Sequence, residues 1–261
     1  MFVLDERYEL IRLLGEGGFG KVYEAMDLST GQVCVVKMIS QADKYTTQEE
    51  LQEILKKEFV LLASLPEHPH LVTVLGGGIY YAMEKFGRPL SQYKGGDKKS
   101  PYFVPQVMTG VFKALWEYHK RGLAHLDVKP SNVLVEQVDD NFQVKLIDPN
   151  LSPQGEMFAG TPEYSSPEFC LDASGATPRS DLYSAGLLFY ELLTGNRPWH
   201  WIEDHTDLIT IRQISAHPRW DRDLPVGIRR LVDDLLMADS NRRPKDVMSC
   251  LKRLEPYPKI Y

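Results

Sequence analysis

The chain has 261 residues and a formal net charge of -6, from 30 Lys and Arg against 36 Asp and Glu. This length suits one large domain or two small lobes with a buried core. Because opposite charges are interspersed, we expect no nucleic acid and no membrane as a partner; both attract clustered Lys and Arg. The three cysteines lack metal spacing, and neither a leader nor a membrane-spanning run of ~20 apolar residues is visible. We expect a soluble, cytoplasmic protein without disulfides.

The N-terminal part predicts an antiparallel meander of strands. Short apolar or β-branched segments separated by Gly, Ser and Asp are typical of such a sheet. They are "LIRLLG" (10–15), "KVYEAMD" (21–27) and "GQVCVVKMI" (31–39). Alternation along the third segment places Val33, Val35 and Lys37 on one face. A lysine at the end of an apolar face needs a partner.

Residues 46–65, "TTQEELQEILKKEFVLLASL", predict a helix that begins with a capping box of Thr47 and Glu50. Its apolar stripe at helical spacing consists of Leu51, Ile54, Leu55, Glu58 and Leu62. Glu58 falls inside this stripe, and a buried carboxylate without a cation is costly. Pairing Lys37 with Glu58 satisfies both patterns. The alternative, that Glu58 lies at the edge of the stripe and reaches water, stays open at this point.

The later part of the sequence is mostly helical. One broad apolar stripe consists of Val107, Met108, Val111, Phe112, Leu115 and Trp116. Residues 180–195 are apolar nearly all round and predict a buried central helix, from a cap at Ser180 to Gly195. Between these helices, residues 132–148 predict a hairpin that turns at Asp-Asp-Asn. Asp148 would then lie just past its second strand.

Two segments before residue 140 carry candidate chemistry. "GEGGFGKV" (15–22) contains the G-x-G-x-x-G pattern, whose glycines let a backbone approach phosphate closely. A strand follows it, and this excludes the dinucleotide-binding βαβ unit, in which a helix would follow. "HLDVKPSNVLV" (125–135) places an acid, a base and an amide in one loop, which a purely structural loop rarely needs. By contrast, "KLIDPNLSP" (145–153) alone does not tell whether Asp148 is a metal ligand or an ordinary turn residue.

With "GTPEYSSPE" (160–168), "SDLYSAG" (180–186) and "NRRP" (241–244), these segments follow the motif order of a known family. The chain resembles a eukaryotic-type protein kinase catalytic domain over nearly its whole length. The resemblance implies a bilobal α+β fold. Its N-lobe, residues 1–84, would be a small antiparallel sheet with one main helix, joined by a hinge at 85–87 to a larger, mostly helical C-lobe at 88–261.

The resemblance also implies an ATP site and a catalytic loop. Lys37 would hold the α and β phosphates, Glu58 would position Lys37, and Asp127 would accept the proton of the substrate hydroxyl, with Lys129 near the transferred group. Asn132 and Asp148 would hold Mg²⁺, which prefers oxygen ligands. The phosphate-covering loop comprises Gly15, Glu16, Gly17, Gly18, Phe19 and Gly20. The adenine site comprises Val22, Val35, Glu84, Phe86 and Leu134.

Other matching positions concern stability and substrate class. Glu168 and Arg243 match a structural ion pair of the family, and Asp181 matches a residue that braces the catalytic loop. Lys129 together with Thr161 resembles the branch that phosphorylates serine and threonine. Ser131 stands where many arginine-directed kinases have glutamate, so a preference for basic substrates is unsupported.

The sequence departs from the family at several positions. Asp-Phe-Gly is here Asp148-Pro149-Asn150; proline biases Asp148 away from helical dihedrals, and asparagine tolerates the positive φ of the missing glycine. Leu126 replaces the arginine that commonly binds a phosphate on the activation segment. Met157 occupies the usual phospho-acceptor position. Because both halves of that switch are absent, we hypothesise activity without phosphorylation of the activation segment. Val35 replaces the usual alanine above adenine, and its effect on the pocket is left open.

The sequence therefore predicts an ATP- and Mg²⁺-dependent protein kinase acting on Ser or Thr of proteins, of unknown oligomeric state. One alternative is a pseudokinase that binds nucleotide or a partner without transfer, which Pro149 and Leu126 motivate. A weaker alternative is a small-molecule phosphotransferase, but such enzymes lack a segment like "GTPEYSSPE".

Overall fold

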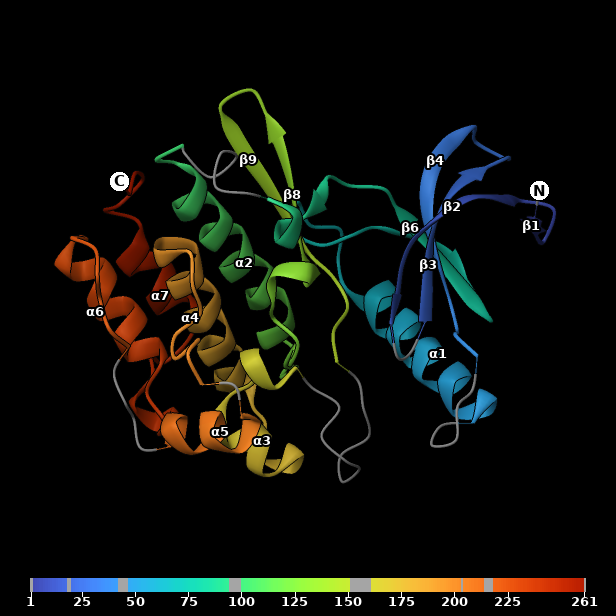
Figure 1. Ribbon diagram of the computed structural model, residues 1–261. Coiled ribbons are helices and arrows are strands. Elements are labelled where there is room, and N and C mark those ends of the chain that lie inside the picture. The colour runs from blue at the N-terminus through green and yellow to red at the C-terminus, as the bar shows by residue number, and fades with distance from the viewer. Residues whose placement is uncertain are drawn as a thin grey trace. The chain divides into compact units, whose positions relative to one another are not determined.

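The computed structural model describes residues 2–17, 20–41, 47–93, 100–150, 161–202, 204–213 and 218–260 (Figure 1). The chain divides into two compact units. The first unit comprises Met1–His68 and Val72–Phe86, and the second comprises Pro69–Leu71 and Gly87–Tyr261. The first is built around a sheet and the second is mostly helical, so the predicted bilobal α+β class is confirmed.

The first unit contains a six-stranded antiparallel sheet in the order β1-β2-β3-β4-β6-β5. Its strands are β1 (Phe2–Leu4), β2 (Tyr8–Gly17), β3 (Gly20–Asp27), β4 (Gln32–Met38), β5 (Val74–Gly77) and β6 (Tyr80–Glu84). One face buries a core of Tyr8, Ala25, Cys34, Val36, Tyr80 and Ala82. The predicted meander corresponds to β2, β3 and β4, whereas β1 was not predicted.

The helix of the first unit is α1 (Gln48–Ser64). It begins with the predicted capping box: Glu50 N–H donates to Thr47 Oγ1 over 3.2 Å, and Thr47 N–H donates to Glu50 Oε2 over 2.7 Å. These bonds satisfy two backbone N–H groups, those of Thr47 and Glu50, that have no partner within the helix. The helix buries Leu51, Leu55, Glu58 and Leu62, as its spacing predicts.

The second unit has a three-stranded sheet, β7 (Arg88–Pro89), β8 (Val133–Val138) and β9 (Asn141–Leu146). The hairpin β8–β9 turns at Asp139 and Asp140, where Asp139 adopts a φ of 54°. Asp148 follows β9 by two residues, as predicted. Leu71 adds an isolated parallel bridge to Leu146, which explains why Pro69–Leu71 belongs to this unit.

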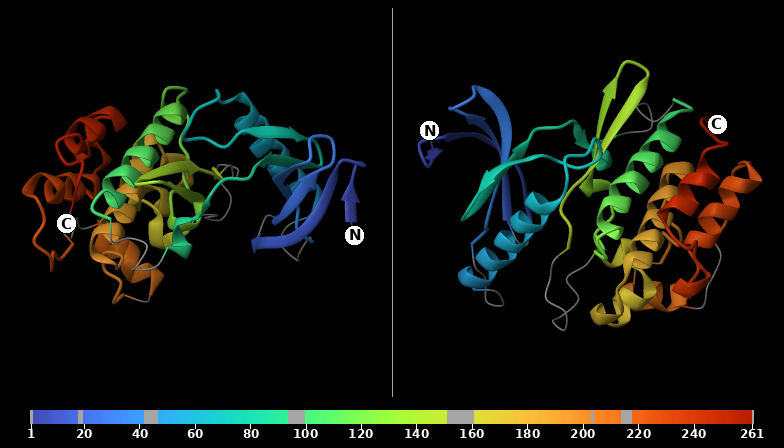
Figure 2. Two further views of the ribbon diagram at one scale, coloured as in Figure 1. Left: turned by 90° about the horizontal axis from the view of Figure 1, so that it is seen from above. Right: turned by 180° about the vertical axis from the view of Figure 1, so that it is seen from behind.

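The remaining elements of the second unit are helical. They are α2 (Phe103–His119), α3 (Pro167–Leu171), α4 (Pro178–Thr194), α5 (His205–Gln213), α6 (Val226–Leu235) and α7 (Val247–Leu254), with short 3-10 turns η1 (Leu90–Gln92), η2 (Pro130–Asn132), η3 (Pro162–Tyr164), η4 (Ala173–Gly175) and η5 (Ser240–Arg242). Helix α2 packs on β9, α4 and α7, and α4 also packs on α6 (Figure 2). No helix among the described residues is long and apolar enough to cross a bilayer.

The buried helix α4 begins earlier than the sequence predicts. Its N-cap is Thr177 rather than Ser180, which instead completes a capping box by accepting the Thr177 backbone N–H over 3.1 Å. Pro178 occupies the first turn, where its missing N–H costs nothing. The helix ends at Gly195 with a φ of 84°, as predicted for a glycine cap.

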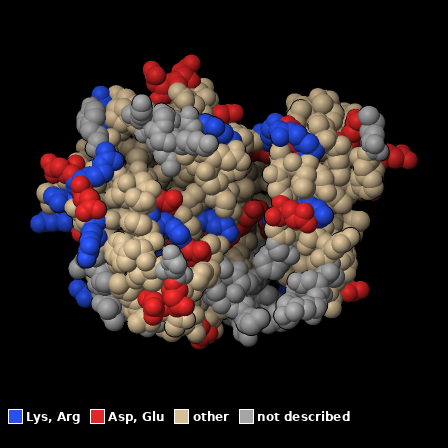
Figure 3. Space-filling view, in the orientation of Figure 1, with Lys and Arg blue, Asp and Glu red and all other residues tan. Residues whose placement is uncertain are grey.

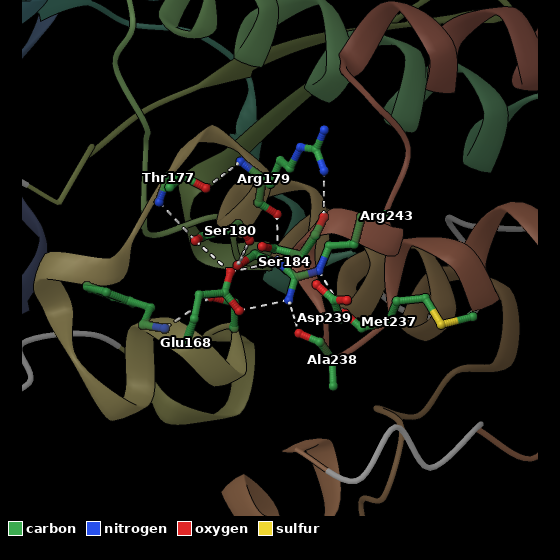
Figure 4. Close-up of polar contacts among 12 residues, drawn as sticks. Glu168, Thr177, Arg179, Ser180, Ser184, Met237, Ala238, Asp239 and Arg243 are labelled. Carbon is green, nitrogen blue, oxygen red and sulfur yellow. Dashed lines mark hydrogen bonds and ion pairs between the residues drawn. The ribbon is translucent and has the colours of Figure 1, made fainter.

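The predicted ion pair of Glu168 and Arg243 is confirmed and joins α3 to the segment after η5 (Figure 4). Arg243 donates to both carboxylate oxygens of Glu168 over 2.6 and 2.7 Å, and Ser180 Oγ donates to the same carboxylate over 2.8 Å. Arg243 also donates to three backbone carbonyls, of Met237, Ala238 and Arg179. Burial raises the pKa of Glu168, but the hydrogen bonds and charge of Arg243, together with hydrogen bonds from Ser180 and the backbone, lower that pKa overall. The pair therefore fastens α3 to α4 and to the C-terminal helices.

Replacing Glu168 by alanine should destabilise the chain strongly, because it leaves the fully buried Arg243 guanidinium without its carboxylate. We expect a loss of roughly 3 kcal/mol in the free energy of unfolding, measured by urea denaturation. The control is Glu163→Ala, which removes a half-exposed pair with Arg197 at 3.9 Å and should cost about 1 kcal/mol at most. Equal losses in the two variants would contradict this role.

Candidate active site

The first unit contains the predicted pair of Lys37 and Glu58. Lys37 Nζ donates to Glu58 Oε1 over 2.7 Å and to Oε2 over 2.9 Å. Only 9% of Lys37 and 5% of Glu58 is exposed. The predicted pairing is confirmed, and the alternative in which Glu58 reaches water is wrong. Lys37 and Glu58 each lie within an apolar face, of β4 and α1 respectively, and therefore meet in the interior of the unit. Their pairing avoids the high cost of burying a single charge.

The glycine-rich segment connects β2 to β3. Register shifts between Leu10 and Arg12 and between Leu13 and Gly15 indicate bulges in β2. Glu16 and Lys21, which face each other across the hairpin, form a salt bridge of 3.1 Å. The predicted loop residues Gly18 and Phe19 lie outside the described residues.

The glycines of this segment differ in whether the surrounding fold leaves room for a side chain. A Cβ on Gly20 would lie 2.5 Å from the carbonyl oxygen of Met38, so β3 can approach β4 only with glycine there. A Cβ on Gly15 or Gly17 would meet no described atom within 4 Å. The described fold therefore has room for a side chain at positions 15 and 17. Glycine at these positions is explained if a phosphate approaches the backbone closely.

The predicted adenine-site residues are divided between the two units. In the first, Val22 is partly buried and Val35 is buried, in neighbouring strands. Glu84 ends β6, where its N–H donates to Thr73 O over 2.9 Å and its Oε1 accepts the Thr73 N–H over 2.6 Å. Phe86 is buried in the first unit, and Leu134 is partly buried in β8 of the second.

In the second unit, the loop before β8 gathers the predicted catalytic groups around Asp127. Lys129 Nζ lies 2.7 Å from Asp127 Oδ2 and donates to Thr161 Oγ1 over 2.8 Å. Thr161 Oγ1 in turn donates to Asp127 Oδ1 over 3.2 Å. Asn132 Nδ2 donates to Asp127 Oδ2 over 2.7 Å and to its backbone oxygen over 2.9 Å. Both carboxylate oxygens of Asp127 are thus oriented by donors from three other residues.

This loop is held from α4 by Asp181, as the sequence predicts. Asp181 is fully buried and accepts the backbone N–H of His125 over 2.8 Å and of Leu126 over 2.7 Å. His119 Nε2 lies 2.8 Å from the same carboxylate. These bonds hold Leu126 at a φ of 61°, an unfavourable value for a side chain of its size. Strain at such a position persists only where the surroundings impose it.

His125 connects the catalytic loop to the end of β9. Its burial is complete and lowers the pKa of the imidazole, which favours the neutral ring. The Nε2–H donates to Ile147 O over 3.0 Å, while Nδ1 accepts the Asp127 N–H over 3.3 Å. The carbonyl of His125 also accepts the Asn150 N–H over 2.8 Å. One neutral tautomer of His125 fits both of its ring contacts.

The turn at Asp148 differs from the sequence-based expectation. Asp148 has a φ of 57°, so it avoids the right-handed helical region, as predicted from the following proline, but adopts the left-handed region and not the extended one. Asn150, predicted to accommodate a positive φ, is not among the described residues that have one. Aspartate is one of the side chains that tolerate the left-handed region. The turn therefore places its strained residue at the carboxylate, and Pro149 is buried.

Asn132 and Asp148 offer oxygen donors that suit Mg²⁺. The Asn132 amide nitrogen donates to Asp127 and, over 3.4 Å, to Asp148 O. Its Oδ1 accepts from Ser131 Oγ over 3.4 Å and has a second lone pair that suits a cation. No group of three or more His, Cys, Asp or Glu among the described residues could hold a metal by itself. Mg²⁺ commonly binds one or two carboxylates and completes its shell with phosphates and water. An amide and a carboxylate fit that requirement.

Sequence patterns missed two features of these groups. Tyr81 Oη donates to Glu58 Oε1 over 2.8 Å, a contact that depends on the register between β4 and β6. The bond of Thr161 to both Lys129 and Asp127 brings together residues 32 and 34 positions apart. Tyr81 could have been found only by pairing two strands that are far apart in the sequence. Ser152, Met157 and Gly160, on which the regulatory hypothesis depends, lie outside the described residues.

The contrast between glycines gives a test. Gly15→Ala should keep the melting temperature of the wild type and weaken Mg-ATP binding about tenfold, as expected for one impaired hydrogen bond to a charged group. Gly20→Ala should lower the melting temperature, because its methyl group would collide with Met38 O. Calorimetric affinity and thermal unfolding measure the two effects. A Gly15→Ala chain that binds Mg-ATP normally would contradict the phosphate assignment.

Comparison with known proteins supports the motif assignment. A family model described as protein kinase domain matches residues 8–254. The chain is 29% identical to a probable serine/threonine-protein kinase of Clostridium perfringens, over 99% of this chain and 40% of that protein. It is 30% identical to NUAK family SNF1-like kinase 1 of Homo sapiens, over 92% of this chain and 37% of that protein.

A third relative is the serine/threonine-protein kinase PknA of Mycobacterium tuberculosis, 31% identical over 92% of this chain and 58% of that protein. The chain thus spans less than two thirds of the length of each of these curated relatives. The matched region nevertheless includes every predicted site residue, from Gly15 to Asp148. Because the family model covers nearly the whole chain, this chain belongs to the protein kinase domain family.

Proposed function

We propose that the chain is an ATP-dependent protein kinase that transfers the γ-phosphoryl group to serine or threonine hydroxyls of proteins. The observation that carries this proposal is the hydrogen-bonded set of Asp127, Lys129 and Thr161. Phosphoryl transfer requires mainly positioning and charge stabilisation. Asp127, held by Lys129 and Thr161, supplies the positioning, and the positive charge of Lys129 supplies part of the charge stabilisation.

Each residue of this set has a distinct role in the proposed reaction. Asp127 Oδ1 or Oδ2 accepts the proton of the attacking hydroxyl and orients that hydroxyl for in-line attack. Lys129 stabilises negative charge on the transferred group. Thr161 keeps Lys129 and Asp127 in their mutual orientation, because its hydroxyl accepts from the first and donates to the second.

The nucleotide would be bound by residues of both units. Lys37, held by Glu58, binds the α and β phosphates, and the backbone around Gly15 and Gly17 covers them. Asn132 Oδ1 and Asp148 would hold Mg²⁺, which would supply neutralisation of charge on the phosphate oxygens. Val22, Val35, Glu84, Phe86 and Leu134 form the adenine site.

A hollow beside the catalytic loop supports a protein as the acceptor. Its volume is about 440 Å³, and its lining includes Lys129, Thr161, Tyr164 and Glu191 from the second unit, together with Leu188 and Leu192. The hollow is open to solvent and not enclosed, which suits an extended chain better than a small, enclosed substrate. An open hollow next to Lys129 and Thr161 therefore favours a protein over a small-molecule acceptor.

We further propose that transfer does not depend on phosphorylation of the activation segment. Asp181 holds the catalytic loop by accepting a hydrogen bond from the backbone N–H of Leu126. The Leu126 side chain takes no part in this bond. A leucine cannot recruit a phosphate, and Met157 cannot carry one. The arrangement of Asp127 therefore rests on hydrogen bonds that are present without a phosphate.

A transfer assay tests the proposed reaction directly. The purified chain is incubated with Mg-ATP and casein, and phosphate incorporation is measured for the wild type, Asp127→Ala and Asp148→Ala. Each variant should lose at least about a hundredfold in rate, since each removes a charged group used in the transition state. The control Asp140→Ala changes an exposed residue of the β8–β9 turn and should retain the full rate. A wild type that binds Mg-ATP without transferring phosphate would favour the pseudokinase alternative.

A second experiment tests the regulatory hypothesis. The chain is treated with a protein phosphatase, separated from it and assayed beside a mock-treated sample. Initial rates should agree within twofold, and Ser152→Ala should behave like the wild type, because no arginine is present beside Asp127 to bind a phosphate. Loss of activity that returns when Ser152 or Thr161 is rephosphorylated would overturn the hypothesis.

A further inference from the structure

The Lys37–Glu58 pair has a third member within the first unit. Tyr81 is fully buried, and its hydroxyl donates to Glu58 Oε1 over 2.8 Å. The same oxygen accepts from Lys37 Nζ over 2.7 Å, and Oε2 accepts from Lys37 Nζ over 2.9 Å. Glu58 is thus fixed by a cation from β4 and a neutral donor from β6.

The register of the sheet creates this arrangement. Lys37 and Tyr81 are direct partners across the antiparallel pair β4–β6. Directly opposed residues project from the same face of a sheet, so both side chains reach the α1 carboxylate from adjacent strands. Tyr80, the preceding residue, projects from the opposite face into the core with Tyr8 and Val36.

Packing around Tyr81 holds its ring in place. Phe59, which follows Glu58 in α1, lies with its ring centroid 6.3 Å from that of Tyr81. Gly77 is opposite Tyr81 on β5, and a Cβ there would lie 2.6 Å from the Phe59 ring and 2.8 Å from Tyr81 Cβ. Glycine at 77 therefore makes room for α1 to bring Phe59 and Glu58 onto Tyr81. The donor is built into the unit by contacts on both sides.

We propose that Tyr81 is a positioning residue that holds the Glu58 carboxylate in the orientation that presents Lys37 to nucleotide phosphates. This inference rests on the proposed function, because Lys37 matters only if the chain binds ATP. It also supplies a cause for competence without phosphorylation, since the donor belongs to the sheet and is present at all times.

The physical reason is the geometry of a buried carboxylate. Two oxygens paired with one flexible ammonium group can rotate together, and Lys37 has several rotatable bonds. A second donor, on a rigid aromatic side chain, removes that freedom, and in a low-dielectric interior a hydrogen bond to a charged acceptor is stronger than in water. Losing the hydroxyl leaves the ion pair but loosens its orientation.

The test uses Tyr81→Phe, which removes the hydroxyl and keeps the ring packed on Phe59. Tyr80→Phe is the matched control, because Tyr80 Oη donates to Asp5 Oδ2 over 2.7 Å in the same strand, away from Lys37. We expect Tyr81→Phe to reduce kcat/KM for ATP about tenfold, the scale of one hydrogen bond to a charged group. Tyr80→Phe should remain within twofold of the wild type. Melting temperatures of both variants separate this effect from a general loss of stability.

A double-mutant comparison separates positioning from packing. Glu58→Met removes the acceptor and keeps the volume of the side chain, so adding Tyr81→Phe to it should change kcat/KM for ATP by less than twofold. If Tyr81→Phe alone behaves like the wild type, the proposal fails. It also fails if Tyr81→Phe reduces kcat/KM equally with Glu58 present and absent, because Tyr81 would then act independently of the pair.

Calorimetric Mg-ATP affinity distinguishes this proposal from the proposed function. If the wild type binds Mg-ATP but transfers no phosphate, the kinase proposal fails. The role of Tyr81 is then tested by the affinities of the variants for Mg-ATP. Tyr81→Phe should then bind Mg-ATP about fivefold more weakly than Tyr80→Phe, the part of the tenfold effect that acts on the ground state. Equal affinities would overturn the role of Tyr81. A wild type without measurable affinity for Mg-ATP would overturn both proposals.

Discussion

The structure depends on the requirement that a buried carboxylate be surrounded by donors. Glu58 in the first unit and Asp181 in the second satisfy it with partners from distant parts of the chain, and the partly buried Glu168 does the same for the buried Arg243. Glu58 joins α1 to two strands, Asp181 joins α4 to the catalytic loop, and Glu168 joins α3 to the C-terminal helices. The polar groups of the candidate site are therefore positioned by charges that are themselves immobilised by the fold.

This arrangement explains how the chain accommodates its departures from the family pattern. Asp181 binds the backbone of His125 and Leu126, so the side chain at 126 can change without releasing the loop. At Asp148, the left-handed φ falls on a residue that tolerates it, and the Asn150 N–H is bonded to His125 O. The described backbone thus holds the loop around Asp127 and the turn at Asp148 together without the arginine or the glycine that most of the family has.

On the face seen in Figure 3, basic and acidic side chains are interspersed over each unit.

Much of the fold is predictable from sequence because it follows local patterns. The capping box at Thr47, the stripe of α1, the β8–β9 hairpin and the Gly195 cap each depend on residues a few positions apart. The pairing of Lys37 with Glu58 was also predictable, because each lies at a polar position within an apolar pattern.

Other features depend on three-dimensional context. The start of α4 at Thr177 was missed because Ser180 is an equally good cap, and Pro178 could equally have ended a loop. The φ of Asp148 contradicts the local preference imposed by Pro149, since hydrogen bonds around Asn132 and His125 decide the turn. Tyr81 was missed because its role comes from the strand register. Local propensity is overruled where several distant partners act on one residue.

Our central proposal is that Lys37, Asn132 and Asp148 bind a magnesium nucleotide. A crystal structure with Mg²⁺ and a non-hydrolysable ATP analogue tests it most directly. The account predicts Asp148 and Asn132 Oδ1 among the metal ligands and Lys37 Nζ on a phosphate oxygen while still paired with Glu58. A bound nucleotide whose metal contacts neither Asp148 nor Asn132, with Lys37 away from the phosphates, would contradict it.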